Sequence, residues 1–246
     1  MSRPKKSKIM RKYFGSRMNC ENVMGYISEN KSSNDTIKVN DEEVSFDIFD
    51  YDYGKDVDKM TKILDRIDIM TDANESSAEI FPYIYGVLDC NLGANSKLYV
   101  LYEPFVGTFR DIHMEVGQSS EWYDITLQII LITEYFKEIM KIGCFADLDH
   151  ILWNRMAKPY YHPYLLDDES VPILRHFDIV VSRFPTDCDN KVPTIELYHK
   201  YVTDLSNFQN TANPPTPRIA EILSIIINNK QDVKSVIDKY FVRKNN

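Results

Sequence analysis

The sequence predicts an α+β fold in two parts, a small antiparallel sheet packed on one helix followed by a mainly helical part. The first observation is a set of short β-branched and aromatic runs around one amphipathic helical pattern, all before residue 104. The second observation is a long apolar helix that opens the remaining sequence. We therefore expect a basic arm at residues 1–18, a sheet-and-helix part at residues 19–103 and a helical part at residues 104–246.

Five runs in the first part have the composition of strands. They are Val23–Ile27, Thr36–Val39, Val44–Phe49, Ile80–Leu88 and Lys97–Glu103. From Asp56 to about Thr71, apolar residues recur at steps of three and four, which predicts an amphipathic helix between the third and fourth runs. The expected order is strand, strand, strand, helix, strand, strand.

The second part begins with a helix that Ser119 or Ser120 caps and that is apolar on most sides up to Gly143. Two short strands, Ile151–Trp153 and Ile173–Phe177, are predicted beyond it. The segment between them, from Lys158 to Glu169, is rich in tyrosine and proline and reads as a surface loop.

Three further helices are predicted at residues 196–208, 218–229 and 232–243. The Asn213–Pro217 segment interrupts the chain between the first two of them. Thr216 is expected to cap the second helix, with Pro217 as its first residue.

Composition narrows the class of protein. With 43% hydrophobic and 27% charged residues, the chain fits a globular protein, and no apolar run approaches the ~18–20 residues that span a bilayer. The four cysteines, Cys20, Cys90, Cys144 and Cys188, are far apart in the sequence. We therefore expect neither a disulfide framework nor a zinc site, and we expect a reducing, intracellular compartment.

Charge is concentrated at the N-terminus. Residues 1–17 carry seven basic side chains and no acidic one, in a chain whose total charge is −8, so the remainder is near −15. Residues 3–17 are a candidate contact for nucleic acid or an acidic partner, or else a solvated tail. The acidic remainder argues against a protein that binds nucleic acid over its whole surface.

Two acidic motifs follow the long helix. The segment Cys144–Trp153 contains Asp147 and Asp149, and Asp178 lies in Phe177–Arg183 about thirty residues later. In their order and spacing with the preceding strands and helix, these motifs make the chain resemble a protein kinase over residues 20–240. The segment Tyr99–Ile112 is similar to the strand and hinge that hold adenine in that family.

Two details narrow the resemblance to divergent kinases. Asp178 is followed at four and five residues by Ser182-Arg183, as in haspin-like kinases, and Phe81-Pro82-Tyr83-Ile84-Tyr85-Gly86 is similar to a strand in the divergent kinases of large DNA viruses. The resemblance implies a two-lobed, protein-kinase-like fold, with a sheet-and-helix N-lobe and a helical C-lobe. It also implies a location in the cytoplasm or nucleus of a host cell, or in the virion.

Phosphoryl transfer requires a carboxylate that orients the acceptor hydroxyl, a lysine on the phosphates and ligands for magnesium. The resemblance implies Asp147 for the first role, Lys38 for the second and Asp178 for the metal, with ATP and Mg²⁺ as cofactors if the protein is active. The residues implied for adenine are Tyr102, Glu103 and Phe105.

Two registers of the catalytic loop remain open. With Asp147 as the catalytic acid and two residues deleted, His150 takes the place of the metal-binding asparagine and Ile151–Trp153 becomes the next strand. With Asp149 as the acid, its fifth follower is Asn154, which restores the family's acid-to-amide spacing.

The chain also departs from the family. It has no G-x-G-x-x-G motif, Phe145 replaces the usual histidine, and the 56–70 helix offers aspartates but no glutamate as partner for Lys38. We therefore expect a pseudokinase, an interaction or regulatory module that binds a partner protein with weak or absent ATP turnover. The alternatives are an active divergent serine/threonine kinase and a non-catalytic structural or virion protein.

Overall fold

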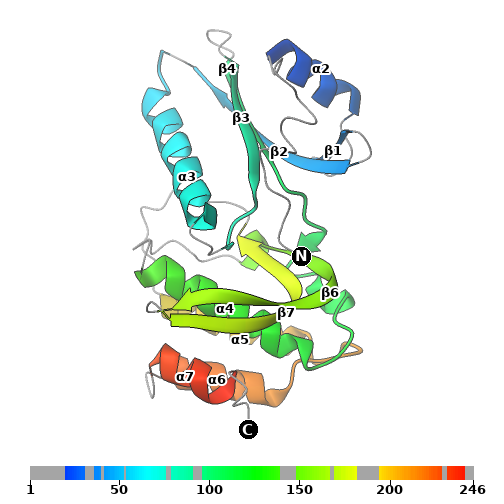
Figure 1. Ribbon diagram of the computed structural model, residues 1–246, viewed down its shortest axis with the longest axis vertical. Helices are drawn as coiled ribbons and strands as arrows, with labels where there is room; N and C mark the ends of the chain where they lie inside the picture. Colours follow the sequence, from blue (N-terminus) through cyan, green and yellow to red (C-terminus); the bar gives the residue numbers. More distant parts are fainter. Residues whose placement is uncertain are drawn as a thin grey trace. The chain divides into compact units, whose positions relative to one another are not determined.

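The computed structural model describes residues 20–30, 36–39, 42–52, 54–75, 79–90, 96–138, 148–166, 169–181, 194–228 and 232–241. Over these residues the fold is α+β with small antiparallel sheets, as the sequence predicts. The chain divides into two compact units, Met1–Phe105 and Val106–Asn246, and each contains one sheet (Figure 1).

The first unit contains a four-stranded sheet in the order β1-β2-β4-β3, and every neighbouring pair is antiparallel. The strands are β1 (Thr36–Val39), β2 (Glu42–Tyr51), β3 (Ile84–Cys90) and β4 (Ser96–Tyr102). Each coincides with a strand predicted from the sequence, with shifts of a few residues at the ends. The last strand is central because β4 pairs with both β2 and β3.

Helix α3 (Val57–Glu75) covers one face of this sheet, and its existence confirms the periodicity prediction. Its residues Met60, Ile63 and Ile67 recur at three- and four-residue steps and therefore lie on one stripe. That stripe packs against side chains of β2, β3 and β4, among them Tyr51 and Leu98.

Helix α2 (Cys20–Asn30) covers the opposite face (Figure 1). The predicted strand Val23–Ile27 is therefore wrong. Cys20, Met24 and Ile27 lie on one helical stripe and pack against an apolar cluster of β2, β3 and β4. Tertiary packing overrides the local β propensity of this segment, because the helix places three apolar side chains on the face of the sheet.

A disulfide joins Cys20 to Cys90, with 5.4 Å between the two Cα atoms. The expectation of no disulfide was wrong for this pair. The two residues are separated by 70 positions in the sequence, so no local spacing could reveal that the fold brings them together.

The second unit contains a three-stranded sheet in the order β5-β6-β7. Its strands are β5 (Gly107–Thr108), β6 (Ile151–Leu166) and β7 (Glu169–Val181). The predicted strands Ile151–Trp153 and Ile173–Phe177 are present. The loop predicted at Lys158–Glu169 is wrong, because residues 160–166 pair with residues 169–175 as the outer half of a long hairpin.

The loop prediction was based in part on the prolines of this segment. Pro163 lies opposite Pro172 in the hairpin, whereas β5 pairs with β6 only at Leu152 and Trp153. The far half of β6 is therefore an edge of the sheet in the described part of the chain, and a proline there removes no hydrogen bond to a third strand.

Helix α4 (Glu121–Glu138) packs against the hairpin and is buried on most sides, as the sequence predicts. The other elements of the unit are the 3-10 turns η3 (Ile112–Met114) and η4 (Leu148–His150) and the helices α5 (Thr194–Asn207), α6 (Pro217–Ile227) and α7 (Val233–Tyr240). Thr216 and Pro217 begin α6 as expected. None of the helices in the described residues is long and apolar enough to cross a membrane.

Candidate functional site

The candidate residues divide between the two units. Lys38, Tyr102, Glu103 and Phe105 belong to the first, and Asp149, His150, Asn154 and Asp178 belong to the second. Asp147 lies outside the described residues, and so does the side chain of Lys38.

The backbone of Lys38 lies in β1, opposite Glu43 of β2. This places the predicted phosphate-binding lysine on the outermost strand of the sheet, whereas the strand that leads into α3 is β2. The sequence of β2, from Glu42 to Tyr51, contains no lysine or arginine.

Strand β2 presents a carboxylate on the face that α3 covers. Phe49 and Tyr51 belong to the cluster that packs beneath α3. Side chains on a strand alternate between faces, so Asp47 lies on the same face as these two residues. Asp47 is half-buried.

The connection after β4 is held by hydrogen bonds within the first unit. The Glu103 N–H donates to the carbonyl oxygen of Tyr83 at 2.9 Å, and the Tyr83 N–H donates to Glu103 Oε2 at 3.3 Å. Tyr102 and Phe105 on either side are half-buried. One backbone donor of the predicted adenine-contacting segment is therefore used in a hydrogen bond to Tyr83, the residue before β3.

In the second unit, the hairpin brings two predicted metal ligands together. Asn154 and Asp178 are directly opposite one another on β6 and β7. However, Asp178 was expected at the end of a strand, and it lies inside one because β7 continues to Val181. The β-branched residues after Asp178 pair with Ile151–Trp153 and extend the strand.

Asp178 is buried beside a buried cation. Its residue is 4% exposed and Arg175 is 0% exposed, and the Arg175 Nη2 atom lies 2.9 Å from Asp178 Oδ1. A carboxylate in a low-dielectric site requires such a partner. A metal ion bound by Asp178 would have to take the place of this guanidinium.

Helix α4 holds Arg175 in place through Gln128. The Gln128 Oε1 atom accepts hydrogen bonds from Arg175 Nε at 3.1 Å and from the Ile179 N–H at 3.3 Å. Its Nε2 atom donates to the carbonyl oxygen of Phe177 at 3.0 Å. Because Gln128 is itself fully buried, these bonds join the helix to the hairpin inside the core.

Sequence reasoning missed this network. The signals were a single glutamine inside the apolar α4 sequence and a single arginine inside the apolar run that ends β7. A polar residue inside a mainly apolar segment is a candidate for a buried hydrogen bond. Its partner, however, cannot be named before the fold is known.

The remaining candidates of the second unit are held by nearby groups. The guanidinium of Arg110 binds both carboxylate oxygens of Asp149, with 2.8 Å between Nη2 and Oδ2. The Oδ1 atom of Asn154 accepts a hydrogen bond from the Val106 N–H at 3.1 Å. His150 is the last residue of η4 and is half-buried.

Within the ranges given above, no group of three or more His, Cys, Asp or Glu side chains is arranged to hold a metal ion. The polar residues of the second unit instead form ion pairs and hydrogen bonds with one another. Such interactions can stabilise a fold. Asp149, the accessible carboxylate among the candidate residues, is paired with Arg110.

Comparison with known proteins identifies a viral relative. No family model matches the sequence. The chain is 30% identical over 274 aligned positions to the uncharacterized protein R691 of Acanthamoeba polyphaga mimivirus, and the alignment covers 98% of this chain and 99% of that protein. The two proteins therefore correspond over their whole lengths. The chain belongs to the same protein family as R691 of the mimivirus.

Proposed function

We propose that the protein is a pseudokinase, a kinase-like module that binds a partner protein and has weak or absent ATP turnover. In this proposal it acts inside a host cell, in the cytoplasm, the nucleus or the virion, which is in keeping with its mimivirus relative. The observation that carries the proposal is the composition of β2, which has no basic residue and places Asp47 on the face beneath α3.

The topology of the first unit supports the kinase-like part of the proposal. A kinase N-lobe combines a small antiparallel sheet with one helix, and the lysine that contacts the phosphates lies on a sheet strand and pairs with a glutamate of that helix. Here the sheet β1-β2-β4-β3 and helix α3 are the corresponding elements. Strand β2, which leads into α3, is the strand on which the lysine would be expected.

The charge on β2 supports the absence of turnover. Phosphate groups need a cation to neutralise them, and a carboxylate in the same place repels them. Residues 57–74 of α3 contain no glutamate that could orient such a cation. Strand β2 and residues 57–74 of α3 therefore lack the lysine–glutamate pair that would hold the phosphates in a kinase-like lobe.

The second unit supports the same conclusion from the metal side. Magnesium must be held by accessible carboxylate or amide oxygens. Asp178 is buried against Arg175, and the Asn154 side-chain oxygen accepts a hydrogen bond from Val106.

A second candidate function is an active, divergent serine/threonine kinase. The observation that favours it is the direct pairing of Asn154 with Asp178 across the hairpin, since these are two of the predicted metal ligands. For activity, Arg175 would have to leave Asp178 when Mg²⁺ and ATP bind.

Nucleotide binding and transfer, measured on the full chain, test the proposal. We expect no transfer of the γ-phosphate to a generic protein substrate and little change in melting temperature with millimolar Mg·ATP. For comparison, a ligand present at 100 times its Kd stabilises a protein by about 2.7 kcal/mol. The Asp47→Lys variant supplies the missing cation, and we expect stronger stabilisation by Mg·ATP in this variant than in the wild type.

A different pattern of activity would support the active kinase instead. Transfer by the wild type that disappears in Asp178→Asn, and in either Asp147→Asn or Asp149→Asn, would establish the active kinase. Ile48→Thr, which changes an exposed position of the same strand, is the control for effects unrelated to charge.

A further inference from the structure

Helix α2 is short and packs on the sheet through apolar side chains. Among its described side chains, Cys20, Met24 and Ile27 pack against the sheet cluster. The helix has 11 residues, with Gly25 near its centre. Isolated helices shorter than about 12–15 residues are marginally stable in water, and glycine lowers helix stability further. A covalent link between α2 and the sheet would therefore contribute strongly to holding the helix in place.

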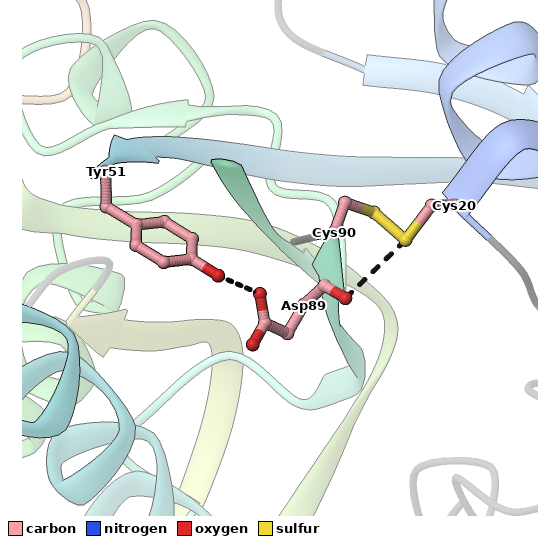
Figure 2. Close-up of a disulfide and its surroundings, with 4 residues drawn as sticks. All are labelled: Cys20, Tyr51, Asp89 and Cys90. Carbon is pink, nitrogen blue, oxygen red and sulfur yellow. Dashed lines mark hydrogen bonds between the residues drawn. A yellow bond between two sulfur atoms is a disulfide. The ribbon is translucent and has the colours of Figure 1, made fainter. Parts of the chain in front are cut away.

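The Cys20–Cys90 disulfide is that additional connection. It joins the first residue of α2 to the last residue of β3 and closes a loop of about 70 residues (Figure 2). A crosslink across a long loop stabilises the folded state because it removes conformations from the unfolded chain. Loss of this bond would leave α2 attached by Met24 and Ile27 among its described side chains.

The two cysteine residues differ in exposure. Cys90 is 0% exposed, whereas Cys20 at the helix start is half-buried. The Cys20 Sγ atom lies 3.5 Å from the carbonyl oxygen of Asp89, which can accept a hydrogen bond from the Cys20 thiol in the reduced protein (Figure 2). An external thiol can therefore approach Cys20 more easily than Cys90.

We propose that Cys20–Cys90 is a thiol–disulfide exchange site that controls the docking of α2 on the sheet. Its reaction partners are dithiol reductants and disulfide oxidants of the thioredoxin class. The bond fastens α2 in an oxidising setting, and its reduction releases α2 from the face formed by Phe46, Tyr99 and Leu101.

Reduction begins when a partner thiolate attacks the Cys20 sulfur. A mixed disulfide forms between the partner and Cys20, and the Cys90 thiolate leaves and takes up a proton. The second thiol of the partner then releases Cys20, so two electrons pass from the dithiol to the protein disulfide. Oxidation follows the same steps in reverse, with the partner disulfide as the electron acceptor.

Hydrogen exchange of the full-length protein tests control of α2. After reduction of the wild type, we expect the amides of α2 to exchange about 30-fold faster or more, which corresponds to the lower end of the usual stabilisation by a disulfide. The amides of α3 should change much less. The Cys188→Ser variant, which keeps the pair intact, should behave as the wild type, and Cys20→Ser should resemble the reduced protein under both conditions.

Trapping tests the exchange route. The probe is a thioredoxin whose resolving cysteine is replaced by serine, so that the mixed disulfide persists. Peptide mapping of the oxidised wild type should find the probe on Cys20. An adduct on Cys90, or none on either residue, would overturn the route. Equal α2 exchange before and after reduction, or alkylation of both cysteines in the oxidised protein, would overturn the proposal itself.

Discussion

The two units bury different kinds of side chain. In the first unit, both faces of the sheet are covered by largely apolar clusters, and the buried polar residues among those described are the neutral Ser45, Asn74 and Ser96. In the second unit, the buried polar residues include charged side chains. These are Glu121, Glu134, Arg175 and Asp178.

This difference in buried side chains indicates which interactions determine the structure of each unit. Apolar clusters tolerate rearrangement as long as volume is kept, whereas a buried charge must meet one particular partner. The β6–β7 hairpin has an irregular register between Arg155 and Tyr160. The hairpin has one ion pair with α4, between Arg155 and Glu121 at 3.1 Å, and one within β7, between Arg175 and Asp178. We infer that these pairs select one register from several that the apolar side chains alone would allow.

Removal of a buried charge should have the largest effect. In Arg175→Met, the Asp178 carboxylate loses its buried cation, and we expect a loss of about 3–5 kcal/mol in the free energy of unfolding. Urea denaturation of the full chain, monitored by tryptophan fluorescence, measures it through Trp122 and Trp153, which both lie in the second unit.

A paired substitution provides the control. The Arg175→Met/Asp178→Leu double variant removes both charges, and its stability should return to within about 1–2 kcal/mol of the wild type. If the single variant were as stable as the wild type, the ion pair would not matter for the second unit.

Alkaline pH should destabilise the second unit by an intermediate amount. Burial raises the pKa of Tyr201, whose hydroxyl lies 2.9 Å from Thr126 Oγ1. The unfolded chain releases the tyrosine proton near pH 10 while the folded chain keeps it, so stability should fall as pH rises above about 10. Each such tyrosine contributes a slope of about 1.4 kcal/mol per pH unit.

The Tyr201→Phe variant removes one of these titrations. Its stability should therefore fall less steeply with pH in urea denaturations between pH 9 and 11. Equal slopes in the variant and the wild type would exclude Tyr201 as a source of alkaline instability.

Loss of an exposed ion pair should have the smallest effect. The Arg110 and Asp149 side chains are 71% and 41% exposed, so solvent screens their attraction. We expect Arg110→Ala to lower the free energy of unfolding by about 0–1 kcal/mol. A loss comparable to that of Arg175→Met would mean that the η4 turn depends on Arg110 for its fold.

Strong local patterns made several elements predictable. The α3 periodicity, the apolar α4 and the Thr216-Pro217 helix start each depend on neighbouring residues, and the structure contains all three. The strand at Val23–Ile27 and the loop at Lys158–Glu169 were mispredicted because distant packing overrode local preference. The site showed the same division, since Asn154 and Asp178 were recognised as candidates while Arg175 and Gln128 were not.

Sequence alone was sufficient for the α+β class and for most of the strands and helices, because these follow from composition and short-range periodicity. Folding decided which residues meet. The bond from Cys20 to Cys90 and the burial of Asp178 against Arg175 depend on how strands and helices pack, since a side chain's environment is set by neighbours that are remote along the chain.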